Sequence, residues 1–237
     1  MRDLEKSLGG LKTRVDTLLR EADPAERRDA WEALPGRRAV NPLLSFLYHT
    51  DEVLKWRAVT AVGIVVARMA EESMESARVV MRRLIWSLND ESGGIGWGAP
   101  EAMAEIMACH EGLAEEYARI FVSYIVEEGN LLENGPLERG VLWGIGRLAQ
   151  VRPALVRHSV PHLVRYLQSE DPGQRGFALW ALGRFPGEVP PGAVEPLLPD
   201  EAGVRIFAHG KVREFTVGDL AERFLAPRSG EAGGQYC

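Results

Sequence analysis

The chain has 237 residues, of which 46% are hydrophobic, and its formal net charge is −6. This composition is typical of a globular domain, and the two cysteines, Cys109 and Cys237, lie too far apart to suggest a disulfide framework or a zinc pattern. The longest apolar run, 59–67, is much shorter than the roughly 20 residues that cross a bilayer, and the charged start of the chain lacks a signal peptide. We therefore expect a cytoplasmic protein without membrane spans, and the acidic balance argues against general affinity for nucleic acid.

Helical periodicity and helix-start signals predict a succession of helices along most of the chain. Asp23, Asp51, Asn134 and Asp171 each stand in a turn that precedes an arginine-bearing helix, and Asp and Asn are favoured caps of helix starts. Ser159 is expected to cap the helix that contains Pro161. The expected helices lie near residues 4–21, 25–34, 39–49, 52–71, 74–88, 98–109, 112–128, 135–150, 160–168 and 173–185.

A short phrase occurs twice, as Trp143-Gly-Ile-Gly-Arg147 and, 37 residues later, as Trp180-Ala-Leu-Gly-Arg184. Weaker copies stand at 30–35, 58–63 and 102–106. A period of this length is typical of stacked pairs of antiparallel helices. The sequence therefore predicts an all-α protein, an α-α superhelix built from repeats.

The pattern changes after Pro186, where closely spaced prolines exclude a regular helix. Two β-prone segments, 204–207 and 212–217, flank His209-Gly210 and predict a small β-hairpin. Thr216 and Asp219 have the spacing of a capping box before a short amphipathic helix, so that hairpin and helix together could cap the repeats. The expected organisation is a repeat array at 1–186, a linker, hairpin and capping helix at 187–226, and a disordered tail at 227–237.

The order of acidic turn, arginine and Ala-x-x-Ala-Leu-Gly resembles the HEAT repeat, in particular the short bacterial HEAT-like repeats named after phycobilin lyases. The resemblance covers about residues 11–185 and is best in the repeats that end near Gly63, Gly146 and Gly183. It implies an ARM/HEAT-like solenoid, a fold used mostly as a binding scaffold, and it implies no reaction. It also implies a structural ladder of turn aspartates and helix arginines, here Asp51, Asp171, Arg57, Arg139 and Arg175.

The repeated phrase supplies the candidate partner-binding residues Trp143, Arg147, Trp180 and Arg184. In each copy the tryptophan and arginine are four residues apart, so they share one helix face. Trp180 is expected to point toward the face of the second helices, which is usually concave, and Trp and Arg are enriched at binding hot spots. The alternative is that each tryptophan fills the groove between neighbouring repeats and that the arginine stem covers it.

The turn 89–100 is longer than the other turns and contains the candidate ligand-binding residues Gly93, Gly94, Gly96, Trp97 and Gly98. Glycine permits close approach of a ligand, and the amides of the following helix start could hold an anion. Glu101 and Glu105 share one stripe of that helix with Cys109, a set that could also bind a metal. A tolerated insertion and a solvated glutamate face remain the alternatives.

The leading hypothesis is a non-enzymatic scaffold that binds a protein or peptide on its concave face, with no cofactor, no metal and no catalytic residue. No catalytic triad, P-loop or HExxH motif is present, although this does not exclude activity. The alternative is an enzyme or cofactor-handling accessory protein with its site at turn 92–98 and helix 100–110. A third hypothesis, nucleic-acid recognition through Arg78, Arg82 and Arg83, is disfavoured by the acidic balance.

Overall fold

The computed structural model describes residues 2–88 and 96–226, with side chains described from residue 10 onward. The chain forms two compact units that divide between Leu113 and Ala114, and each is described here by itself. Within the described ranges, no helix combines the length and the apolar character that crossing a bilayer requires. Gly93, Gly94 and the predicted disordered tail lie outside the described residues.

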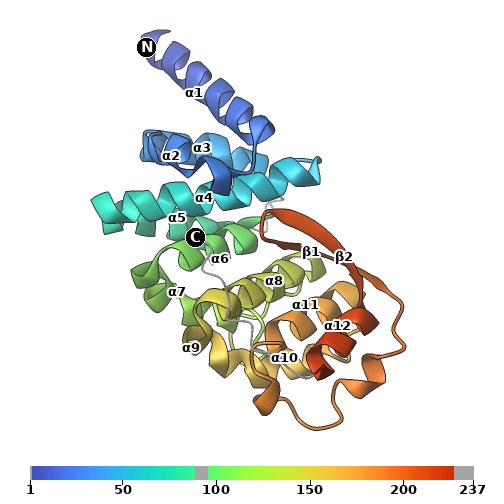
Figure 1. Ribbon diagram of the computed structural model, residues 1–237. Coiled ribbons are helices and arrows are strands. Elements are labelled where there is room, and N and C mark those ends of the chain that lie inside the picture. Colours follow the sequence, from blue (N-terminus) through green and yellow to red (C-terminus); the bar gives the residue numbers. More distant parts are fainter. Residues whose placement is uncertain (1, 89–95, 227–237) are drawn as a thin grey trace. The chain divides into compact units, whose positions relative to one another are not determined.

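The first unit is built from helices whose order matches the predicted order (Figure 1). α3 packs on α4, α5 packs on α6, and the second helices of these two pairs, α4 and α6, pack on each other. As predicted, Asp51 begins α4, because its carboxylate accepts hydrogen bonds from the amides of Val53 and Leu54. The elements are α1 (Arg2–Glu21), the 3-10 helix η1 (Pro24–Arg27), α2 (Arg28–Glu32), α3 (Gly36–Phe46), α4 (Glu52–Glu72), α5 (Met74–Leu88) and α6 (Ala99–Cys109).

The core of the first unit is centred on α6. Every residue of this helix from Ala99 to Ala108 is buried, as expected of a helix that is apolar on most sides. The neighbouring α4 contributes a continuous buried segment, Ala61–Ala67. These two helices place Glu101 and Glu105 inside the unit.

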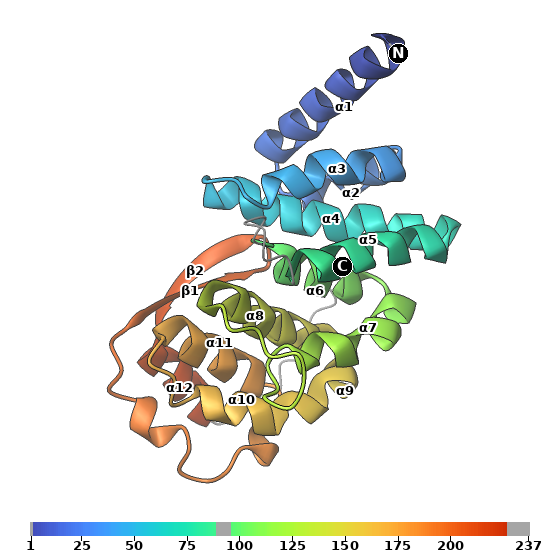
Figure 2. The same ribbon diagram turned by 180° about the vertical axis from the view of Figure 1, so that it is seen from behind.

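The second unit repeats the paired arrangement and adds the C-terminal hairpin and helix (Figure 2). α10 packs on α11, and the second helices α8 and α11 lie side by side. The elements are α7 (Glu111–Ser123), most of which belongs to this unit, α8 (Gly135–Val151), α9 (Pro153–Val156), η2 (Arg157–Ser159), α10 (Val160–Tyr166), α11 (Pro172–Leu182), η3 (Pro186–Glu188), η4 (Glu195–Leu197), β1 (Gly203–Ala208), β2 (Lys211–Thr216) and α12 (Val217–Leu225).

The predicted hairpin is confirmed. β1 and β2 are antiparallel, and the turn between them places His209 and Gly210 at φ of 53° and 72°, as a two-residue hairpin turn requires. The capping box of Thr216 and Asp219 begins α12, which packs on α11. Hairpin and helix thus pack on the last repeat, while the predicted domain boundary at 186 stays a prediction.

Two local predictions are wrong. α7 ends at Ser123 rather than near 128, because the amide of Asn130 turns back to the carbonyl oxygen of Ser123, at 3.0 Å, and so closes a loop. Ser159 occupies the expected position before α10 but does not cap it. Its buried hydroxyl donates instead to the carbonyl oxygen of Val156, at 2.6 Å.

Candidate functional site

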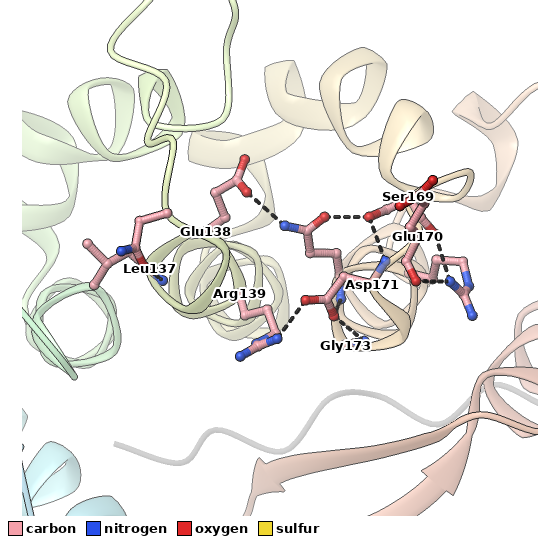
Figure 3. Close-up of polar contacts among 10 residues, drawn as sticks. Leu137, Glu138, Arg139, Ser169, Glu170, Asp171 and Gly173 are labelled. Atoms are coloured by element: carbon pink, nitrogen blue, oxygen red, sulfur yellow. Dashed lines mark hydrogen bonds and ion pairs between the residues drawn. The ribbon is translucent and has the colours of Figure 1, made fainter.

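The N-terminal ends of α8 and α11 are joined by the ladder that the resemblance implied (Figure 3). Asp171 caps α11 by accepting hydrogen bonds from the amides of Gly173 and Gln174, and its second oxygen accepts from Nη1 of Arg139 at 2.6 Å. Arg139 belongs to α8, so one aspartate both starts a helix and links it to its neighbour. These two residues therefore belong to the scaffold.

The other two arginines of the expected ladder bind backbone carbonyl groups. Arg57 donates to the carbonyl oxygens of Leu19 and Arg20, at the end of α1, at 2.8 and 3.1 Å. Arg175 donates to the carbonyl oxygens of Ser169 and Glu170 and also pairs with Asp200. Helix ends leave carbonyl groups unpaired, so these arginines hold the repeat turns in place.

A chain of polar side chains extends the ladder on the same two helix ends. Glu138 accepts a hydrogen bond from Nε2 of Gln174, at 2.7 Å, and Ser169 donates to Gln174 (Figure 3). The hydroxyl of Tyr166 donates to the other oxygen of Glu138, at 3.0 Å. Burial, and to a smaller extent the charge of Glu138, raises the pKa of Tyr166 to about 12. Each carboxylate oxygen of Glu138 and the side-chain oxygen of Gln174 thus accepts a hydrogen bond within this polar network, which we assign to the scaffold.

Trp143 does not present its ring to solvent, contrary to our expectation for a partner-binding residue. Its side chain is only 1% exposed, and Nε1 donates to the carbonyl oxygen of Phe207 in β1 at 2.9 Å. Its ring stacks on that of Trp180 with a centroid distance of 6.3 Å. For Trp143 the structure therefore favours the alternative, in which the tryptophan fills the space between packed elements.

Trp180 is only half-buried and has a different environment. A Cβ atom at position 146 would lie 2.4 Å from its ring, so Gly146 makes room for it between α8 and α11. Arg184 follows the end of α11 and is also half-buried, as is Arg147 on α8. The accessible part of the predicted site thus consists of Trp180, Arg184 and Arg147.

The hairpin explains why Trp143 is covered. β1 lies against α11, where a Cβ atom at position 176 would stand 2.7 Å from a methyl group of Val204. Val204 and Ile206 are 3% and 1% exposed, so one face of β1 is part of the core. The hairpin therefore occupies part of the second-helix surface of this unit.

Steric requirements explain the two glycines in the described part of the glycine-rich turn, Gly96 and Gly98. A Cβ atom at position 96 would lie 2.7 Å from the carbonyl oxygen of Ser87. Gly98 has a φ of 77° at the N-cap position of α6, a conformation that favours glycine. Trp97 between them is 40% exposed. These two glycines are explained by the fold, and the turn exposes one aromatic ring.

The glutamates of α6 are buried, so the solvated face that their spacing also allowed is wrong. Glu101 pairs with Nζ of Lys55 on α4 at 3.0 Å, and Glu105 packs against Gly63 and lies 3.8 Å from Sγ of Cys109. Across residues 2–88 and 96–226, no three His, Cys, Asp or Glu side chains gather closely enough to hold a metal ion. Charged side chains are seldom buried without a partner, so the ion pair with Lys55 accounts for the burial of Glu101.

Two hollows on the surface were not predicted from the sequence. One, of about 620 Å³, lies between α7 and the segment 154–161, and its residues include Arg119, His158 and Glu188. Burial, with the charges of Arg119 and His162, holds the pKa of His158 below its usual value. The other, of about 430 Å³, lies between α3 and α5. Both join segments distant in sequence, and the exposed valine and arginines of α5 were the only local signal.

Comparisons with known proteins agree with this architecture. The family model of the HEAT-like repeat matches residues 136–185. A protein of Archaeoglobus fulgidus, described as uncharacterized, is 35% identical over 143 residues, which are 59% of this chain and 69% of that protein.

Solved structures of designed repeat proteins share the fold at low sequence identity. A computationally designed armadillo repeat protein for modular peptide recognition has a TM-score of 0.51 at 15% identity, covering 95% of this chain and 93% of its own. An engineered protein has a TM-score of 0.50 at 16% identity, covering 91% of this chain and 95% of its own. At these identities the similarity shows the fold alone.

Proposed function

The chain belongs to the HEAT-like repeat family, and we propose that it is a non-enzymatic scaffold that binds a protein or peptide partner. The observation that supports this proposal is the half-buried Trp180, held in a fixed orientation by Gly146 and by the ring of Trp143. A preordered aromatic ring contributes contact area at little entropic cost, as binding hot spots do. A designed armadillo protein for modular peptide recognition shares the fold, which agrees with this use.

The proposed contact surface is the second-helix face of the second unit, with Trp180, Arg184 and Arg147 as its residues. Trp180 is half-buried and its indole N–H is a hydrogen-bond donor, so we expect it to donate to a carbonyl oxygen of the partner. Trp143 lies beneath this surface and acts by supporting the ring of Trp180.

The test is native mass spectrometry of the untagged protein, isolated gently from its own organism. We expect a second polypeptide in fixed stoichiometry, and we expect Trp180→Ala to lose it while circular dichroism shows that the variant remains folded. Tyr48→Ala, which removes an exposed aromatic side chain of the first unit, is the control and should retain the partner.

Two results would count against the proposal. Equal retention by the Trp180 and Tyr48 variants would exclude this surface. Excess mass of a metal or cofactor in place of a polypeptide would instead support the alternative site at the glycine-rich turn and α6. The pairing of Glu101 with Lys55 makes that alternative the weaker one, because the carboxylate already has a cationic partner.

A further inference from the structure

The hollow between α3 and α5 has an apolar floor. Val40, Met69 and Val80 form this floor, and each is 5% exposed. The two helices are the first helices of successive pairs, so the hollow lies on a different surface from the face of α4 and α6. We call it the α3–α5 groove, and its residues all belong to the first unit.

Two hydrogen bonds cross the α3–α5 groove in opposite directions. Arg37 of α3 donates to the hydroxyl of Ser76 of α5, at 2.5 Å. Arg83 of α5 donates to the side-chain oxygen of Asn41 of α3. Each of the two helices therefore supplies one arginine and one neutral acceptor, and the two guanidinium groups lie at separate places along the edge of the groove.

The positive charge of these arginines is not balanced inside the groove. Within the described residues, neither Arg37 nor Arg83 pairs with a carboxylate. Glu75 also lines the groove, but Arg82 and Arg78 of its own helix engage it at 2.5 and 3.8 Å, and the hydrogen bond to Arg82 lowers its pKa. The groove is thus locally positive in a chain whose net charge is −6.

Two exposed apolar side chains, Val79 and Trp86, stand on the same side of α5, one in the groove and one beyond it. Val79 lines the groove and is 53% exposed, and Trp86, seven residues later on the same helix side, is 81% exposed. A tryptophan this exposed beside an apolar hollow is typical of an interaction surface.

We propose that the α3–α5 groove binds an acidic segment of a protein partner that carries an aliphatic or aromatic side chain between carboxylates. The apolar side chain covers Val40 and Val80, while carboxylates replace the neutral partners of Arg37 and Arg83. A charge-assisted hydrogen bond between guanidinium and carboxylate is about twice as strong as a bond to a neutral acceptor, which favours this exchange. Trp86 gives the segment a further apolar contact beside the groove.

The experiment uses three fluorescein-labelled peptides and the full chain, with fluorescence anisotropy as the measurement. The peptides are Glu-Glu-Leu-Phe-Glu-Glu, its basic counterpart Lys-Lys-Leu-Phe-Lys-Lys, and Glu-Glu-Ala-Ala-Glu-Glu, which lacks the apolar anchor. We expect the first peptide to bind about tenfold more tightly than either of the others, and its affinity to fall as salt is added. Absence of binding by the first peptide, or equal binding of the first two, would overturn the proposal.

Substitutions locate the bound peptide. Arg83→Ser and Val79→Glu should each weaken binding of the acidic peptide about tenfold, the first by removing a donor and the second by adding a repelling charge. Both residues are exposed, so the fold should persist, which circular dichroism can check. Arg20→Ser, at an exposed arginine of α1 that pairs with Asp16, makes the same charge change outside the groove and should have no effect.

The outcome is independent of the proposed function of Trp180. Trp180→Ala should leave binding of the acidic peptide unchanged, because that residue belongs to the other unit. Equal losses of affinity for the acidic peptide in the Arg83 and Arg20 variants would mean that only the net charge of the protein matters, which would overturn the proposal. A loss in the Trp180 variant alone would move the peptide to the second-helix face, which supports the proposed function and contradicts this one.

Discussion

The two copies of the repeated phrase show how one sequence acquires two environments. Trp143 and Trp180 stand at equivalent positions of α8 and α11, and their rings touch. Yet Trp143 is 1% exposed and hydrogen-bonded through its indole nitrogen, while Trp180 is half-buried. The difference arises from β1, whose Phe207 carbonyl reaches only the first copy.

A residue of the repeat can thus change its structural role between two copies without changing its identity. The hairpin covers one tryptophan and thereby makes it a core residue, and the second tryptophan then rests on the first. Gly176 is part of the same arrangement, because its missing side chain lets β1 approach α11.

The largest effect is expected from removing the two rings separately. Trp143→Ala should lower the free energy of unfolding by about 4 kcal/mol, because it empties a fully enclosed volume. Trp180→Ala should lower the free energy of unfolding by less than about half of this amount, since solvent already reaches the Trp180 ring. Urea unfolding measures both, and equal losses would show that the two environments do not differ energetically.

A smaller effect is expected at the contact that seats the hairpin. Gly176→Ala should destabilise by about 2 kcal/mol, because the new methyl group overlaps Val204. The double variant with Val204→Ala should recover part of this loss, and a double-mutant cycle measures the coupling. Strict additivity of the two substitutions would mean that this contact does not position β1.

A still smaller effect is expected at alkaline pH, from Tyr166 in the polar network that joins the ends of α8 and α11. Tyr166 has a pKa of about 12 in the folded protein and of about 10 in the unfolded chain. Because the unfolded chain loses its proton first, the free energy of unfolding falls as the pH rises between these two values. The loss should reach about 1.4 kcal/mol at about pH 11. Tyr166→Phe should remove this component from unfolding curves measured across that range. An unchanged pH dependence in the variant would show that the pKa is not raised.

The smallest effect is expected for the ladder. Arg139→Gln should cost about 0.5 kcal/mol, because the ion pair with Asp171 is partly exposed to solvent. Tryptophan fluorescence of this variant should match that of the unchanged protein. A large shift of the fluorescence emission would mean that the ladder, rather than the hairpin, determines the positions of the Trp143 and Trp180 rings.

Local signals predicted most of the fold. Asp51, Asn134 and Asp171 begin helices as their residue types indicate, because a cap depends only on the amides two or three residues away. The hairpin turn at His209 and Gly210 is equally local. The family resemblance added the Arg139–Asp171 link, which spacing alone does not specify.

The site was less predictable, because exposure depends on distant segments. The cover over Trp143 comes from a residue 64 positions later. Glu101 pairs with a lysine 46 positions earlier, so the sequence could not show that it is buried. The α3–α5 groove likewise joins Arg37 to Ser76, and neither residue belongs to a recognisable motif.

The bond between Trp143 and the Phe207 carbonyl has a consequence for biosynthesis. The 64 residues from Gly144 to Phe207 take about 3–13 s to translate at ~5–20 residues per second, and during that interval α8 exists without its cover. A nascent chain halted before β1 would present a large apolar ring to the ribosome surface and to chaperones. The emergence of β1 is therefore the step that covers Trp143 and removes this exposed ring from the nascent chain.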